Sequence, residues 1–158
     1  MPFIFNAAPA YNDAFIAEGF PVRDLYLSGA VYNMAWVGPF ETDTPGHAAM
    51  RATWGNFSDS ASSYVVAGWS SQYHIKGVLE AAAKGGDLTR AGIRRAASNV
   101  TVESDGMMTP RELGIDGPDP ESTITAPDAS VGSGSATVKA NYAGPTASAY
   151  DWSQGPCS

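Results

Sequence analysis

The spacing of apolar residues predicts a long helix over residues 62–84, and the rest of the chain is organised around it. Apolar side chains recur there at intervals of three to four residues, which is the period of a helix with one buried side. Gly85 and Gly86 follow and favour a helix end. Thr89 is a good N-cap for a second helix over 89–98. This stretch therefore predicts two consecutive helices joined by a tight turn.

A third helix is predicted near residues 44–54. Either Asp43 or Thr44 caps it, and Pro45 occupies the first helical position, where the missing N–H of proline removes no intrahelical hydrogen bond. Gly55 then marks the end of the helix.

The first forty residues predict a small α/β unit. Residues 1–6 form an apolar run typical of a strand, Asn12 can cap a short helix over 13–18, and residues 24–28 alternate like a second strand. The order strand, helix, strand implies a parallel pairing. Residues 29–40 are rich in aromatic side chains but contain two glycines and a proline, so we expect a connecting segment.

The pattern changes after residue 98. Residues 100–103 predict a brief strand, and 109–134 are rich in proline and Asp-Gly turns, which indicates a long surface loop with a small edge strand at Ile124. Residues 134–142 alternate and predict a further strand. The overall prediction is an α/β fold.

Composition and charge exclude several classes of function. The chain has 158 residues, a net charge of −7 and a pI of about 4.6, which argues against nucleic acid and against an anionic membrane surface as partners. No apolar run approaches the length needed to insert into a bilayer, and no signal peptide is recognisable at the start. Cys157 is the only cysteine, so it is either a free thiol or paired outside this chain.

Candidate catalytic and metal-binding groups are sparse. His47 and His74 fall on different predicted helices and outside any metal-ligand spacing, so no metal and no cofactor is predicted. Aromatic residues do gather near turns, and rings with a polar tip suit the wall of a small-molecule cleft; for Trp69 and Tyr73, packing in the core is the better interpretation. These aromatic residues are Tyr11, Tyr26, Tyr32, Trp36, Tyr64, Trp69 and Tyr73.

Four stretches together resemble a known family. They read FIFNAAPAYNDAF, PFETDTPGHAAMRATW, SSYVVAGWSSQYHIKGVLEAAAKGGDLTRAGI and YAGPTASAYDWSQGPC. They are similar to the C-terminal portion of the extracellular substrate-binding proteins of branched-chain amino-acid-type ABC transporters, the type I periplasmic binding proteins of the leucine/isoleucine/valine class. The stretch GGDLTRAGI is the most specific of these similarities.

The resemblance implies part of a two-lobed fold, with parallel sheets flanked by helices and most of the N-terminal lobe missing. It places residues 1–34 in the second lobe and 35–109 in the first, with helices near 44–54, 62–84 and 89–98. Residues 110–158 return to the second lobe and form the tail. The abrupt start and the unpaired Cys157 fit a truncated chain.

The resemblance also implies ligand-binding residues. The loop after the first strand contacts the ligand in the family, and here it contains Tyr11 and Asn12. An aromatic residue at the start of the long helix lines the cleft, and Tyr64 matches that position. Tyr32 lies at a crossing between the lobes and is a further candidate. The family's typical acidic residue is absent from the loop, which argues against a simple branched-chain amino acid as ligand.

The implied function is that of the solute-binding component of an ABC importer. It would be extracytoplasmic in its full-length form, bind an amino-acid-like, amide or aromatic-acid ligand between its lobes, and be recognised by the permease. We expect no enzymatic activity, and we expect the isolated chain to be prone to self-association. Two alternatives stay open: a ligand-sensing regulatory domain of the same fold, and an α/β enzyme that uses His47 or His74.

Overall fold

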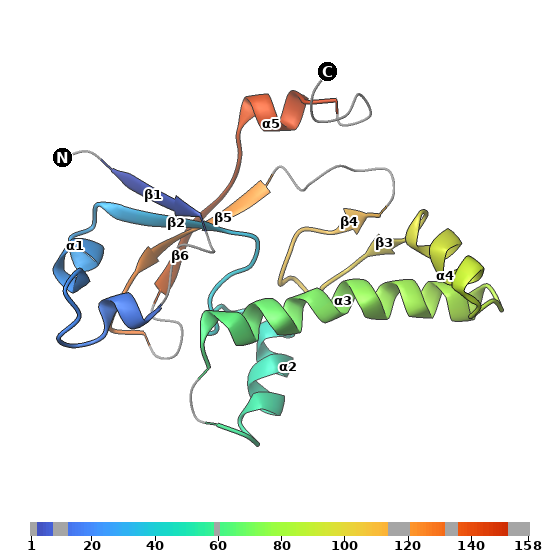
Figure 1. The fold of residues 1–158 in the computed structure, drawn as a ribbon, viewed down its shortest axis with the longest axis horizontal. Helices are drawn as coiled ribbons and strands as arrows, with labels where there is room; N and C mark the ends of the chain where they lie inside the picture. Colours follow the sequence, from blue (N-terminus) through green and yellow to red (C-terminus); the bar gives the residue numbers. More distant parts are fainter. Residues whose placement is uncertain (1–2, 8–12, 59–60, 114–120, 132–135, 152–158) are drawn as a thin grey trace.

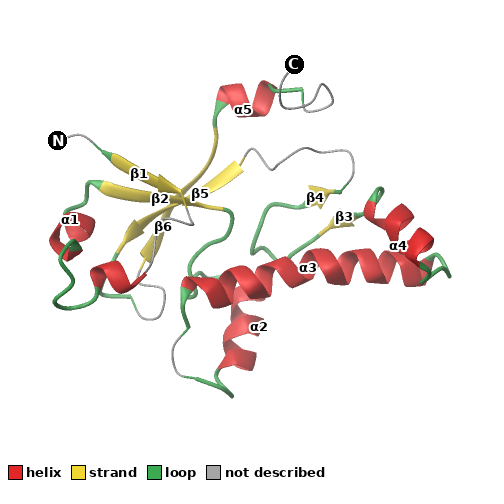
Figure 2. Cartoon of the chain, viewed as in Figure 1, coloured by secondary structure: helices red, strands yellow, loops and turns green. Residues whose placement is uncertain are grey.

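The computed structural model describes residues 3–7, 13–58, 61–113, 121–131 and 136–151, which form two units (Figure 1 and Figure 2). The sheet unit contains β1 (Ile4–Ala7), the 3-10 helix η2 (Asp13–Ile16), α1 (Arg23–Leu27), β2 (Val31–Ala35), β5 (Glu121–Pro127) and β6 (Ala136–Ala143). The helical unit contains α2 (Pro45–Trp54), α3 (Ser63–Lys84), α4 (Arg90–Ala97), β3 (Thr101–Val102) and β4 (Arg111–Glu112). A last helix, α5 (Pro145–Ala149), follows β6 at the top of Figure 1.

The sheet of the sheet unit has the strand order β1-β2-β5-β6. β1 and β2 pair in parallel, with Ile4 opposite Val31, whereas β2–β5 and β5–β6 are antiparallel. The predicted α/β class is therefore confirmed, but the sheet is mixed and not parallel throughout. A separate antiparallel pair, β3 with β4, belongs to the helical unit.

Two strand predictions in this unit are wrong. Residues 24–27 belong to α1 and Ser28 is its C-cap, and the strand that pairs in parallel with β1 is β2, inside the segment predicted to be a connector. Five alternating residues are too few to distinguish a strand from a short helix. The strand at Ile124 is also placed differently, because β5 lies between β2 and β6 and is not an edge.

The helices of the helical unit lie where local capping signals place them. The Thr44 hydroxyl accepts a hydrogen bond from the His47 N–H at 3.2 Å, and the Thr89 hydroxyl accepts one from the Gly92 N–H at 3.2 Å. Both contacts satisfy amides that a helix start leaves without a partner. Gly86, just after α3, has φ +71°, a conformation that glycine adopts without steric cost.

The main hydrophobic core lies where α2 and the first half of α3 meet three connecting segments. Partly buried residues, among them Trp69 and Tyr73, pack against it as expected. We call its buried members the core cluster; they are Val37, Phe40, Met50, Ala61, Val66 and Met107.

Candidate functional site

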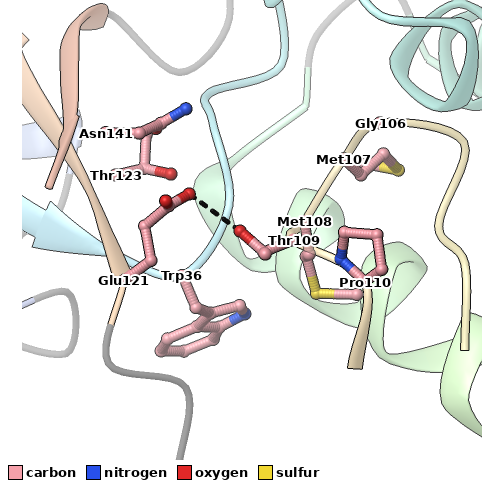
Figure 3. Close-up of a pocket in the computed structure, with 9 residues that line it drawn as sticks. All are labelled: Trp36, Gly106, Met107, Met108, Thr109, Pro110, Glu121, Thr123 and Asn141. Atoms are coloured by element: carbon pink, nitrogen blue, oxygen red, sulfur yellow. Dashed lines mark hydrogen bonds between the residues drawn. The ribbon is translucent and has the colours of Figure 1, made fainter. Parts of the chain in front are cut away.

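A cavity of about 220 Å³ lies between the sheet unit and the loop that leaves β3. Residues from distant parts of the chain form its walls, and Figure 3 shows how their side chains lie. The lining residues are Trp36, Gly106, Met107, Met108, Thr109, Pro110, Glu121, Thr123 and Asn141.

The sheet provides the polar wall of the cavity. Thr123 pairs with Ala35 on one side and with Asn141 on the other, so β5 and β6 present Thr123 and Asn141 on the same face. Glu121 lies two residues before Thr123 and has the same orientation. Trp36 follows the last residue of β2, at the carboxyl end of a parallel strand, which is where α/β sheets commonly bind ligands.

The opposite wall is a tight loop held to the start of α2. The Ser104 hydroxyl accepts a hydrogen bond from the Met108 N–H at 2.8 Å and donates one to the Met108 carbonyl at 2.9 Å. Asp105 and Gly106 both have positive φ, at 51° and 79°. The Gly46 N–H donates to the Asp105 carbonyl at 2.9 Å. These contacts fix the loop that carries Met108 and Thr109 relative to α2.

One side-chain hydrogen bond joins the two walls. The Thr109 hydroxyl donates to Glu121 Oε1 at 2.8 Å (Figure 3). A carboxylate, hydroxyls and an amide beside an indole ring offer mainly hydrogen-bond acceptors and one aromatic surface. Such a set suits a small ligand with N–H donors, and an indole face attracts a cation or another ring.

The segment that carries Trp36 from the sheet to α2 is anchored by side chains of that helix. His47 Nε2 lies 3.1 Å from the Gly38 carbonyl, and Arg51 Nη1 donates to the Phe40 and Thr42 carbonyls at 2.7 and 2.9 Å. The segment therefore belongs to the helical unit up to the residues next to Trp36.

The surroundings of the His47 ring favour its neutral form, and its contacts assign one tautomer. The ring is fully buried, and this burial, followed by the nearby Arg51 charge, lowers its pKa, although the hydrogen bond to the Gly38 carbonyl opposes the shift. A carbonyl can only accept, so Nε2 carries the proton, and Nδ1 accepts from the Thr44 hydroxyl at 2.7 Å. Both ring nitrogens are thus engaged in structural hydrogen bonds.

Of the four predicted ligand-binding residues, the two that the structure describes, Tyr32 and Tyr64, do not line this cavity. Tyr11 and Asn12 lie outside the described residues. Tyr32 points to the other face of the sheet, because its side chain is on the opposite side of β2 from those of Asn33 and Ala35. Its ring centroid lies 5.7 Å from the centroids of Phe3 and of Phe5. Tyr64 lies in the first turn of α3 and is 65 % exposed. Their roles stay predictions.

The cavity residues that sequence reasoning missed carry little local signal. Glu121, Thr123 and Asn141 fall in a predicted loop and in a predicted strand, and only the long-range pairing of β2, β5 and β6 brings them together. Trp36 belongs to the aromatic stretch over residues 29–40, and the signal that would identify it as a site residue is its position directly after β2.

Neither a metal site nor a membrane span is found in the described part of the chain. Within the described ranges, no three His, Cys, Asp or Glu side chains are grouped so that they could hold a metal ion. Among the described helices, none is both long and apolar enough to traverse a bilayer.

Comparison with known proteins assigns the fold. The chain is similar to the solved structure of a fatty acid ABC transporter substrate-binding protein from Thermomonospora curvata, with a TM-score of 0.77 and 23 % sequence identity. The chain has part of a periplasmic substrate-binding protein fold. The match covers 94 % of this chain and spans only 38 % of the length of the Thermomonospora protein. Neither a family model nor a curated protein matches the sequence.

Proposed function

We propose that this chain is the C-terminal part of the solute-binding component of an ABC importer. The observation that carries the proposal is the fold match over 94 % of the chain, and the cavity between the units supports it. The two lobes of the full-length protein would close around a ligand bound between them. The permease would then recognise this closed form. The same proposal assigns residues 1–34 and 110–158 to the second lobe and residues 35–109 to the first. It also gives the full-length protein an extracytoplasmic location.

The lining of the cavity favours a small ligand with an amino or amide group. Glu121 and Asn141 would accept its N–H donors, and Trp36 would pack against a ring or an apolar side chain. A cavity of about 220 Å³ is smaller than the roughly 300–1,000 Å³ of pockets for drug-sized ligands. The Glu121 carboxylate would attract the ammonium group of an amino acid, and a fatty acid has no such group. We therefore prefer an amino-acid-like or amide ligand over a fatty acid, the ligand class named for the Thermomonospora protein.

The binding mechanism that we propose is non-covalent. The two units would move relative to each other around the cavity, and the Thr109–Glu121 hydrogen bond would be remade around the ligand. Tyr11, Asn12, Tyr32 and Tyr64 are proposed as further contacts on the strength of the family resemblance alone.

Ligand titration followed by NMR tests the proposal. We expect the Trp36 indole signal to shift on addition of an amino acid or its amide, and laurate to have a smaller effect. Replacing Glu121 by Gln removes a charge-assisted hydrogen bond and should weaken binding about tenfold. The exposed Glu18→Gln is the matched control and should leave binding unchanged.

A lack of response across amino acids, amides, aromatic acids and laurate would contradict the proposal. Equal responses from the Glu121→Gln and Glu18→Gln variants would instead place the ligand outside this cavity.

A further inference from the structure

The sheet contains a buried carboxamide to which no described residue forms a hydrogen bond. Asn33, in the middle of β2, is 2 % exposed. Its side-chain oxygen and its side-chain nitrogen both lack a hydrogen-bond partner within the described chain. Buried polar groups in native proteins nearly always have a partner, either in the protein or in ordered water. The Asn33 carboxamide therefore points to an occupant beyond the described residues.

Asn33 belongs to a row of polar residues that crosses three strands. In the strand register, it lies opposite Asn6 of β1 and opposite Thr125 of β5. Opposite residues share one face of a sheet, and neighbouring strands lie roughly 4.7–4.9 Å apart. Thr125 is buried as well, at 5 % exposed. The two neighbouring strands thus place a carboxamide and a hydroxyl beside the Asn33 side chain.

The polar row lies on the face of the sheet that α1 covers. α1 packs beside β2 (Figure 1), and Asn6 Nδ2 donates a hydrogen bond to the Tyr26 hydroxyl of α1 at 3.1 Å. Val31 precedes Asn33 by two residues, so it shares this face, and it is 1 % exposed. The Asn33 carboxamide is therefore enclosed between a strand and a helix, out of contact with bulk solvent.

The spacing of the row suits water. A water molecule that makes two hydrogen bonds of about 2.8 Å spans up to roughly 5.6 Å, which matches the separation of neighbouring strands. Asn33 offers both a donor and an acceptor, and the Thr125 hydroxyl can act as either. A cation is disfavoured, because the Asn33 –NH2 group only donates and no group of side chains in the described ranges could hold a metal ion.

We propose that Asn33 anchors a buried water site between β2 and α1. One water molecule lies between Asn33 and Thr125 and forms a hydrogen bond with each. Water on the other side, toward Asn6, satisfies the second end of the carboxamide in the same way. Buried waters of this kind typically make about three hydrogen bonds and are costly to remove.

The water site is separate from the candidate ligand cavity. Asn6, Asn33 and Thr125 are absent from the lining of that cavity, although Thr123, two residues before Thr125, belongs to it. The inference is therefore independent of the proposed function. Adding an amino acid to the chain should leave the water at Asn33 in place, whether or not the cavity binds the ligand.

NMR cross-relaxation between water and the side-chain amides of the whole chain tests the proposal. We expect the Asn33 –NH2 signals to show cross-relaxation with water, with the sign typical of a bound molecule. The internal control is Asn99, which is exposed and donates to the Arg95 carbonyl at 2.9 Å. Its amide contacts bulk water only, so it should show no cross-relaxation of that sign.

Two variants examine the partners of the water. The larger side chain of Asn33→Leu fills the space and removes the anchor, so magnetic relaxation dispersion should count at least one fewer long-lived water molecule. The matched control Asn99→Leu should leave the count unchanged. Thr125→Val keeps the shape of the side chain and removes one hydrogen bond, so the residence time of the water should fall at least about threefold. Thermal unfolding verifies that each variant folds.

Three results would overturn the proposal. The first is the absence of bound-water cross-relaxation at the Asn33 amide. The second is a count of long-lived waters that Asn33→Leu leaves unchanged. The third is a residence time that Thr125→Val does not shorten, because the proposed water is shared between these two residues.

Discussion

The core cluster and the open apolar face of the sheet contain similar residues in opposite environments. We call this open surface the aromatic sheet face; its large apolar members are Phe3, Phe5, Tyr32, Met34, Ile124 and Tyr142. Met50 of the core cluster is fully buried, whereas Met34 of the aromatic sheet face is 40 % exposed. Phe40 is 7 % exposed in the core cluster, and Phe5 is 58 % exposed on the sheet. Side-chain chemistry therefore does not distinguish the two regions.

The two regions differ in whether the described chain provides a covering layer. Around Met50, the segment before α2 is held by hydrogen bonds from His47 and Arg51, and the loop after β3 is held by Gly46. These contacts bring Val37, Phe40 and Met107 over α2 and α3. The aromatic sheet face lies on four strands paired in one sheet, but no described element packs across it. Burial here depends on topology more than on hydrophobicity.

The largest contrast is expected between two methionine-to-alanine substitutions. Met50→Ala should lower the free energy of unfolding by about 2–5 kcal/mol, because it leaves a cavity in a packed core. Met34→Ala should lower it by less than about 1 kcal/mol, since its side chain already contacts water. Urea unfolding of both variants measures the difference. Similar losses would mean that the aromatic sheet face is as well packed as the core cluster.

Two glycine substitutions probe the same contrast through added volume. A Cβ at Gly46 would overlap Met107 Cγ and lie 2.8 Å from the Ser104 carbonyl, so Gly46→Ala should destabilise the protein by about 1–3 kcal/mol. Gly68→Ala in α3 meets open space and should stabilise it by about 0.5–1 kcal/mol, because alanine favours a helix. Thermal unfolding checks both signs. A loss of stability at Gly68 would show that this side of α3 is covered.

A smaller effect is expected from pH through His47. Burial lowers the pKa of this ring from its ordinary value of 6.5, so the unfolded chain binds a proton at a higher pH than the folded chain does. The contribution of His47 to stability is then complete when the pH is above the ordinary pKa of 6.5. It is lost as the pH falls through the lowered pKa of the folded state. Urea unfolding at several pH values measures this dependence. The free energy of unfolding of His47→Gln should fall less steeply with decreasing pH than that of the unmodified chain. An unchanged slope would contradict a neutral buried His47.

The sequence predicted the helical unit better than the sheet unit, for a physical reason. Helices α2, α3 and α4 begin and end at local signals such as Thr44, Pro45, Thr89 and Gly86, and these signals act within a single turn. The strands depend on partners far away in the chain: β2 pairs with β1 and β5, and β5 pairs with β6 across the sheet. Local signals cannot report such pairings: alternation misassigned α1 as a strand, and the prolines and Asp-Gly turns of residues 109–134 predicted a loop where β5 lies.

The candidate site was less predictable than the fold. Trp36 lies at the carboxyl end of a strand whose flanking glycines and proline suggested a connector, while Glu121 and Thr123 fell in a presumed loop. The polar wall exists only because three strands align in register. Spacing along the chain does not report this register.

Native-state hydrogen exchange of the 158-residue chain tests the central claim, that the core cluster is complete whereas the aromatic sheet face lacks a layer. Exchange free energies report local opening. We predict that the amides of α2 and of α3 near Val66 exchange most slowly. The amides of β1 and β2 should exchange faster, because this part of the sheet can open without unfolding the rest of the chain. Equal or greater protection of Ile4–Ala7 and Val31–Ala35 would contradict the account, because it would show that the sheet is stable without a second covering layer.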